Sequence, residues 1–160
     1  MGYEVLNDQL IHELLSVSKR VKNPSARGSY KYRHQQTDYS VEDESGNYHF
    51  TLYLRQNSII EDDFSCGLAW NMPSGETVTL IRYNGSSHSH PNHLENERLG
   101  YICHIHKATE RYALAGKKPD GFATDAQTKY ETLKGALHCL LTDCNIQGLT
   151  SAPDEPDLFS

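Results

Sequence analysis

An alternation of apolar and other side chains runs through the middle of the chain and is typical of half-buried strands. Residues 48–55 carry a large apolar side chain at every second position, namely Tyr48, Phe50, Leu52 and Leu54. Residues 64–70 repeat the alternation, and after a turn signal at residues 72–75 a β-branched run covers residues 77–83. These segments predict one strand followed by a hairpin of two more.

Two other segments have apolar side chains at helical spacing. The first contains Leu10, Ile11, Leu14, Leu15 and Val21. Asn7 is a suitable N-cap for it, so we expect a helix that begins at Asp8 and is stopped by Asn23-Pro24. The second contains Tyr130, Leu133, Leu137, Leu140 and Leu141, which would share one helix face. We expect Thr124 or Asp125 to cap that helix.

The remaining segments are shorter. Residues 22–29 and the polar residues 85–98 are expected to be loops, and residues 101–106 a short strand. Residues 108–115 fit either a helical turn or extended structure. The order predicts an α+β fold, in which an antiparallel sheet of four to six strands has an N-terminal and a C-terminal helix packed on one face.

The length of 160 residues fits a single domain over residues 1–150, and the acidic, proline-containing residues 151–160 are expected to be a disordered tail. No apolar stretch approaches the roughly 20 residues of a membrane span, and no secretory signal is visible. We therefore expect no membrane partner and a cytoplasmic location. The four cysteines show no CxxC spacing and are expected to be reduced, buried thiols.

Charge is unevenly distributed along the chain. The net charge of −6 argues against a surface covered with phosphate-binding groups. Residues 19–34 nevertheless carry six lysines and arginines and no acid, whereas residues 151–160 carry three acids. Either segment is a candidate docking site for a protein partner, and the basic segment, with Tyr30 and Tyr32 to stack on bases, is a candidate RNA contact.

Histidines cluster in one part of the chain. Five of the nine fall between His88 and His106, within nineteen positions. His104 and His106 lie two apart on a predicted strand, so their imidazoles should point to the same side. His88 and His90 have the same spacing in the preceding loop. We expect these four side chains to converge on one site.

The residues around the histidines are of types that bind phosphate or carboxylate groups. Arg82 precedes the loop, and Lys107 and Arg111 follow the second histidine pair. Arginine offers a two-pronged donor to phosphate oxygens and lysine a point charge. Glu110 and Tyr112 are candidates to orient a histidine.

These motifs resemble a known group of proteins. The quoted residues are Arg82-Tyr83-Asn84-Gly85, His88, His90, His104-Ile105-His106, Glu110-Arg111-Tyr112 and Asp143-Cys144-Asn145. They look like an uncharacterised bacterial domain family and are distantly similar to TumE-type toxins of toxin–antitoxin pairs. The similarity covers roughly residues 77–146, and the long N-terminal half departs from the short TumE-type chains. It implies a toxin or defence role.

The leading hypothesis is a metal-independent ribonuclease or phosphodiesterase that acts on RNA or a related phosphodiester. In it His104 and His106 exchange protons with the substrate, and His88 and His90 gate or complete the site. Arg82, Lys107 and Arg111 bind the phosphate. No cofactor is expected.

Two alternatives remain open. The first is a hydrolase with zinc or another divalent metal held by His88, His104 and His106. The second is a non-catalytic interaction module, such as an antitoxin or adaptor. The sequence lacks a Walker loop, a dinucleotide fingerprint and a G-x-S-x-G elbow, which argues against P-loop and ordinary esterase chemistry.

Overall fold

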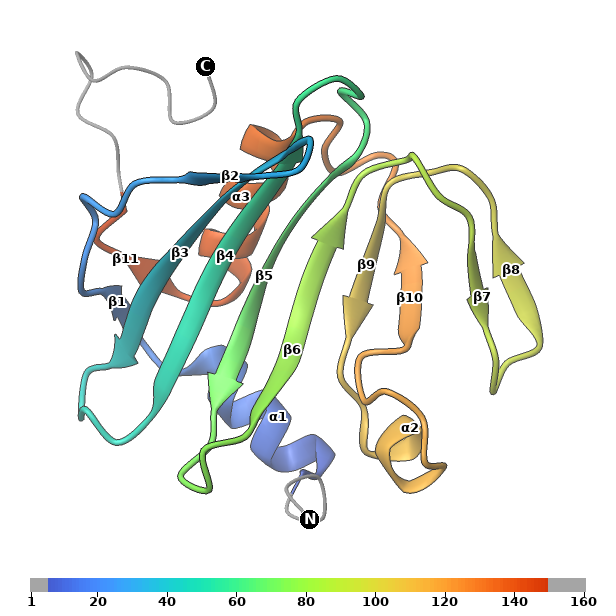
Figure 1. The fold of residues 1–160 in the computed structure, drawn as a ribbon. Coiled ribbons are helices and arrows are strands. Elements are labelled where there is room, and N and C mark those ends of the chain that lie inside the picture. Colours follow the sequence, from blue (N-terminus) through green and yellow to red (C-terminus); the bar gives the residue numbers. More distant parts are fainter. Residues whose placement is uncertain (1–5, 150–160) are drawn as a thin grey trace.

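The computed structural model describes residues 6–149, which fold around a large, mostly antiparallel sheet (Figure 1). The strands are β1 (Lys19–Val21), β2 (Ser29–Lys31), β3 (His34–Asp43), β4 (His49–Asn57), β5 (Phe64–Asn71), β6 (Thr77–Asn84), β7 (His90–Asn92), β8 (Glu97–Leu99), β9 (His104–Lys107), β10 (Phe122–Asp125) and β11 (Ile146–Gln147). Nine of these described strands form one sheet, in the order β10-β9-β6-β5-β4-β3-β1-β11 with β2 beside β3. β7 and β8 form a separate hairpin.

The centre of the sheet follows directly from the alternation in the sequence. β4, β5 and β6 pair antiparallel, and the register places Leu52 opposite Leu68 and Leu68 opposite Ile81. These side chains are buried in the core, whereas the intervening side chains of β4 are only half-buried. The sheet therefore has one apolar face and one polar face.

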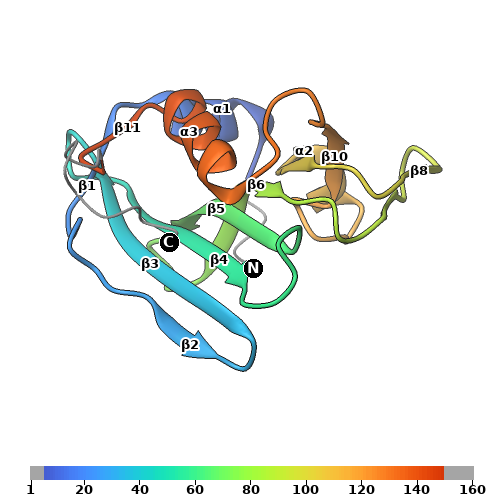
Figure 2. The same cartoon turned by 90° about the horizontal axis from the view of Figure 1, so that it is seen from above.

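Three helices complete the described part of the chain: α1 (Asp8–Ser16), α2 (Glu110–Leu114) and α3 (Leu133–Asp143). Figure 2 shows α1 and α3 on the same side of the sheet. Their apolar side chains, including Ile11, Leu14 and Leu137, belong to the core. Asn7 caps α1 by accepting a hydrogen bond from the Leu10 amide at 2.8 Å.

The side of the sheet opposite α1 and α3 is the open face, defined by the polar side chains of Tyr53, Arg55, Ser65, Arg82 and Asn84. These five residues are half-buried. Asn84 lies opposite Ser65, and Ser65 lies opposite Arg55, so the three form one row across β6, β5 and β4. A ligand that reaches this face meets polar groups of adjacent strands.

The mixed α+β class and the helix from Asp8 are confirmed, but the strand count and the helix placement differ from the prediction. The sheet exceeds six strands because residues 19–21, expected to be helical, form β1 between β3 and β11. Thr124 and Asp125, either of which was expected to cap the second helix, belong to β10, and α3 is capped by Thr132 instead. Residues 85–98, expected to be a loop, contain β7 and the first two residues of β8.

Lys19 is buried, although it belongs to the basic segment expected at the surface. Its ammonium donates hydrogen bonds to the carbonyls of Leu15, Val17 and Cys144 at 2.9, 3.0 and 2.7 Å. These carbonyls belong to the C-terminal ends of α1 and α3, where a positive charge complements the helix dipole. Lys19 therefore joins the two helix ends to β1.

Burial lowers the pKa of Lys19 to about 8. Between that pH and the ordinary lysine pKa of 10.5, the unfolded chain holds a proton that the folded chain has lost, so stability must rise with pH. Relative to Lys19→Met, the free energy of unfolding of the wild type should increase by about 3 kcal/mol over this range. Urea unfolding at pH 7.5 and pH 10 measures the difference. The exposed Lys22→Met is the control, and a pH-independent difference for Lys19→Met contradicts the prediction.

No helix within residues 6–149 has the length and apolar character needed to cross a membrane. The four cysteines are unpaired, and Cys66, Cys103 and Cys144 are buried. The predicted acidic tail over residues 151–160 lies outside the described residues.

Candidate functional site

β6 and β9 bring the predicted histidine pair beside Arg82. These strands pair antiparallel, with Arg82 opposite His106 and Asn84 opposite His104. Because side chains alternate along a strand, all four project from the open face. Tyr83 and Ile105 point the other way into the core.

A third imidazole completes a cluster of three rings, which we call the histidine cluster: His90, His104 and His106. The His90 ring comes from β7 and lies 4.4 Å from the His106 ring and 5.7 Å from the His104 ring, measured between centroids. The His104 and His106 rings are 5.0 Å apart. His104 and His106 are almost fully buried, at 2% and 3% exposed, whereas His90 is half-buried.

Each ring of the cluster is fixed by one hydrogen bond to a backbone carbonyl. His104 Nδ1 lies 2.8 Å from Ile102 O, His106 Nδ1 3.0 Å from Asp120 O, and His90 Nε2 2.7 Å from Gly121 O. A carbonyl only accepts, so each of these nitrogens must carry the proton. In the neutral rings, His104 Nε2, His106 Nε2 and His90 Nδ1 are therefore the basic nitrogens.

The surroundings of His104 and His106 favour neutral rings. Burial lowers the pKa of His106 to about 2, and the guanidinium of Arg82 and the two neighbouring imidazoles act in the same direction. Burial also lowers the pKa of His104, with smaller contributions from His90 and Arg82. At neutral pH these two rings are therefore uncharged, and the Nε2 atom of each can accept a hydrogen bond.

Two buried side-chain atoms beside the cluster have no hydrogen-bond partner: Arg82 Nε, which is a donor, and Asn84 Oδ1, which is an acceptor. Within residues 6–149 they are the only buried side-chain atoms of this kind. The Arg82 guanidinium also lies 3.5 Å from the carboxylate of Asp120. Buried polar groups normally find partners, so two unpartnered ones on the same strand indicate a place where a polar ligand binds.

Asn92 holds the β7–β8 hairpin against the edge of the main sheet. This side chain is fully buried, and it donates to Ala123 O and accepts from Ala123 N, both at 2.8 Å. It also donates to Glu97 on β8 at 2.8 Å. The side-chain amide of Asn92 thus pairs with β10 as a neighbouring strand would. Because His90 lies two residues before Asn92 in β7, this contact also positions the His90 ring.

The other predicted site residues lie apart from the histidine cluster. His88 is 77% exposed and sits 4.0 Å from the carboxylate of Asp63, so it does not take the place beside His104 that His90 occupies. Lys107 is exposed and opposite Ile81, on the face of the sheet that bears the core. A metal set of His88, His104 and His106 is therefore not assembled.

Glu110, Arg111 and Tyr112 belong to α2 and make contacts of their own. The Glu110 amide donates to the carboxylate of Asp8 at 2.9 Å. Arg111 and the Tyr112 hydroxyl both bind the carboxylate of Glu95 in the β7–β8 turn. These residues connect α2 to α1 and to the hairpin rather than to the imidazoles.

The basic segment does not form one surface. Lys19 is buried. Ser29 pairs with Gln36 of β3, and Lys31 pairs with His34. Ser29 and Lys31 therefore lie on the open face, which the even-numbered residues of β3 share. Tyr30 alternates to the other side. RNA contact by this segment stays a prediction.

Metal binding has no support from the arrangement of side chains. Across the described chain, no three His, Cys, Asp or Glu side chains are grouped so that they could hold a metal ion. The neutral rings face Arg82, whose positive charge disfavours a bound cation.

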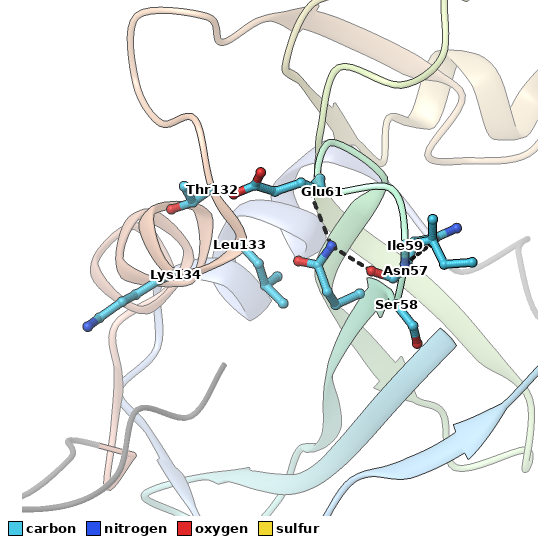
Figure 3. A pocket seen from close by; sticks show the side chains of 8 residues that line it. Asn57, Ser58, Ile59, Glu61, Thr132, Leu133 and Lys134 are labelled. Carbon is cyan, nitrogen blue, oxygen red and sulfur yellow. Dashed lines mark hydrogen bonds between the residues drawn. The ribbon is translucent and has the colours of Figure 1, made fainter. Parts of the chain in front are cut away.

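Two cavities lie elsewhere. One, of about 470 Å³, lies between the β4–β5 loop and the start of α3; Leu133 points toward the loop and Lys134 away from it (Figure 3). The other, of about 480 Å³, lies on the helix side of the sheet and includes Lys107 and His12 in its lining. Neither contains a residue of the histidine cluster.

Asn84, Asn92 and Asp120 were not predicted as parts of the site. Asn84 could have been found, since it stands two residues after Arg82, directly beyond the strand predicted over residues 77–83. Asn92 and Asp120 lie in segments without periodicity, so nothing local marked them.

No protein-family model, curated protein or solved structure matches this chain. The resemblance to TumE-type toxins therefore stays a prediction.

Proposed function

We propose that the protein is a metal-independent phosphodiesterase that cleaves RNA at the histidine cluster. The observation that supports this proposal most strongly is the convergence of three imidazoles with fixed proton positions beside an arginine that has an unpartnered donor. Paired imidazoles and a cation are the groups that proton transfer at a phosphate requires.

The reaction follows from these groups. The 2′-hydroxyl of RNA attacks the adjacent phosphorus while Nε2 of His104 or His106 takes its proton. The bond from phosphorus to the 5′-oxygen breaks, and a protonated imidazole of the cluster gives its proton to that oxygen. The products are a 2′,3′-cyclic phosphate and a 5′-hydroxyl, and Arg82 binds the phosphate oxygens throughout.

The proton for the leaving group enters when substrate binds. In the free protein Arg82 helps to keep His106 neutral. A phosphate bound to Arg82 offsets that positive charge, which raises the pKa of the neighbouring imidazoles and favours protonation of one ring. His90, the most exposed ring of the cluster, is the route by which this proton arrives from solvent.

The test is incubation of single-stranded RNA with the purified protein in excess EDTA, with analysis of the product ends. We expect cleavage with 2′,3′-cyclic phosphate and 5′-hydroxyl ends. Cleavage that requires an added divalent ion would replace the metal-independent mechanism with the metal-dependent alternative. No cleavage of any RNA with or without metal would leave the non-catalytic interaction module.

Arg82→Lys should reduce kcat/KM for RNA by about 10²-fold, because a lysine ammonium replaces a two-pronged donor with a single point charge. Steady-state cleavage rates measure the change. Arg98→Lys is the matched control, since Arg98 is exposed and bonds Ser89 on the hairpin surface. Equal rates for the two variants would remove Arg82 from the mechanism.

A further inference from the structure

We propose that Asn84 recognises a ribose 2′-hydroxyl in a nucleotide next to the scissile phosphate, so that the protein binds RNA more tightly than DNA. This inference rests on the proposed function, and it adds the residue that determines the sugar specificity of that site.

Asn84 is held rigidly at the edge of the histidine cluster. It is opposite His104, and directly opposed residues in an antiparallel pair have Cβ atoms about 4.5–5.5 Å apart. The Tyr130 hydroxyl lies 2.8 Å from the backbone carbonyl of Asn84 and 3.0 Å from that of His104. The side chain of Asn84 takes no part in these backbone contacts, so replacing it leaves them in place.

The unpartnered atom of Asn84 specifies what the ligand must offer. Oδ1 is buried and only accepts hydrogen bonds, so its partner must be a donor. A phosphodiester carries no proton at neutral pH and cannot supply one. A ribose hydroxyl can, whereas the corresponding carbon of deoxyribose carries only hydrogen.

Arg82 supplies the complementary half of the recognition. It lies two residues earlier on β6 and projects from the same face, and its unpartnered Nε needs an acceptor. A phosphate oxygen meets that need. One donor and one acceptor on alternate residues of a strand thus match a phosphate and a nearby hydroxyl, which RNA presents together.

Proton counting indicates which hydroxyl is recognised. The attacking 2′-hydroxyl has a single proton, and the proposed reaction gives it to an imidazole of the cluster. That proton is not available to Oδ1 of Asn84. The partner of Asn84 is therefore the 2′-hydroxyl of a nucleotide that flanks the attacking one.

The experiment uses a single-stranded RNA of about ten nucleotides and the His106→Asn background, so that the RNA binds without being cleaved at any of its 2′-hydroxyls. Each nucleotide is then made 2′-deoxy in turn, and Kd is measured by fluorescence anisotropy. We expect one of these changes to weaken binding by about tenfold when Asn84 is present, and Asn84→Ala to lose that discrimination.

Two further variants separate specificity from folding. Asn84→Asp keeps an acceptor oxygen, so it should preserve the discrimination while binding all the RNAs more weakly, because its charge repels phosphate. Ser65→Ala, on the strand next to Asn84, should leave the ratio unchanged. Equal binding of all the RNAs when Asn84 is present, or discrimination that survives in Asn84→Ala, would overturn the inference. The binding measurement needs no cleavage. If the protein discriminates among these RNAs but the wild type cleaves none, the proposed reaction is refuted and recognition by Asn84 stands.

Discussion

His106→Asn is expected to lower kcat/KM for RNA cleavage by 10²–10⁴-fold, the usual contribution of one proton-transfer group. His106 is 3% exposed, lies opposite Arg82 and is 4.4 Å from the His90 ring, so its substitution removes one of the two buried imidazoles proposed to take the proton, the one opposite Arg82. Asparagine retains a donor for the carbonyl of Asp120, which limits the effect on folding. Cleavage rates under saturating and limiting RNA measure the loss.

His138→Asn is the matched control for this variant, because His138 is exposed on α3. It should cleave at the wild-type rate. If His106→Asn kept full activity while remaining folded by circular dichroism, His106 would have no part in the chemistry, and full activity of His104→Asn as well would exclude the histidine cluster.

Asn92→Ala should reduce both stability and activity. The substitution leaves the amide and carbonyl of Ala123 without partners at the buried edge of β10. Unpaired buried groups are unfavourable by about 1–3 kcal/mol each, so we expect the free energy of unfolding to fall by about 3 kcal/mol. Urea unfolding measures this change, and amide hydrogen exchange at Ala123 should become faster.

The effect of Asn92→Ala on cleavage tests the role of the hairpin. Once the hairpin is released, His90 no longer packs against His106, and the rate should fall together with the stability. Asn47→Ala, on the exposed β3–β4 turn, is the control and should change neither quantity. A variant that loses stability but cleaves normally would show that His90 is not needed.

The central strands were predictable because their signal is local. Tyr48, Phe50, Leu52 and Leu54 alternate within one segment, and burial of alternate residues in β4 agrees with that pattern. The cap of α1 was predictable for the same reason, since Asn7 and the Leu10 amide it binds are three residues apart.

The edges of the sheet depend on pairing between distant segments. β1 has three residues and is defined by β3 and β11, the latter more than 120 positions away. Lys19 likewise appeared to be a surface charge, because the carbonyl of Cys144 that it binds is 125 residues away. No property of residues 19–21 alone distinguishes such a strand from the end of a helix.

The histidine pair on β9 could be placed on one side of the sheet because alternate residues of a strand share a face. The choice between His88 and His90 could not be made in the same way. It depends on Asn92, which docks the hairpin through backbone groups of Ala123, 31 residues later. Lys107 was predicted to belong to the site because it follows His106 in the sequence, but it lies on the opposite face of the sheet from His106.

The most direct measurement of the central claim is the protonation of the cluster imidazoles, followed by ¹⁵N NMR as a function of pH with and without inorganic phosphate. In the free protein, His104 and His106 should remain neutral and protonated on Nδ1 below the ordinary histidine pKa of 6.5. Phosphate should raise the apparent pKa of at least one of the two rings, because it offsets the charge of Arg82. Ordinary titration of both rings near pH 6.5, or titration that phosphate leaves unchanged, would contradict a phosphate-coupled proton-transfer site.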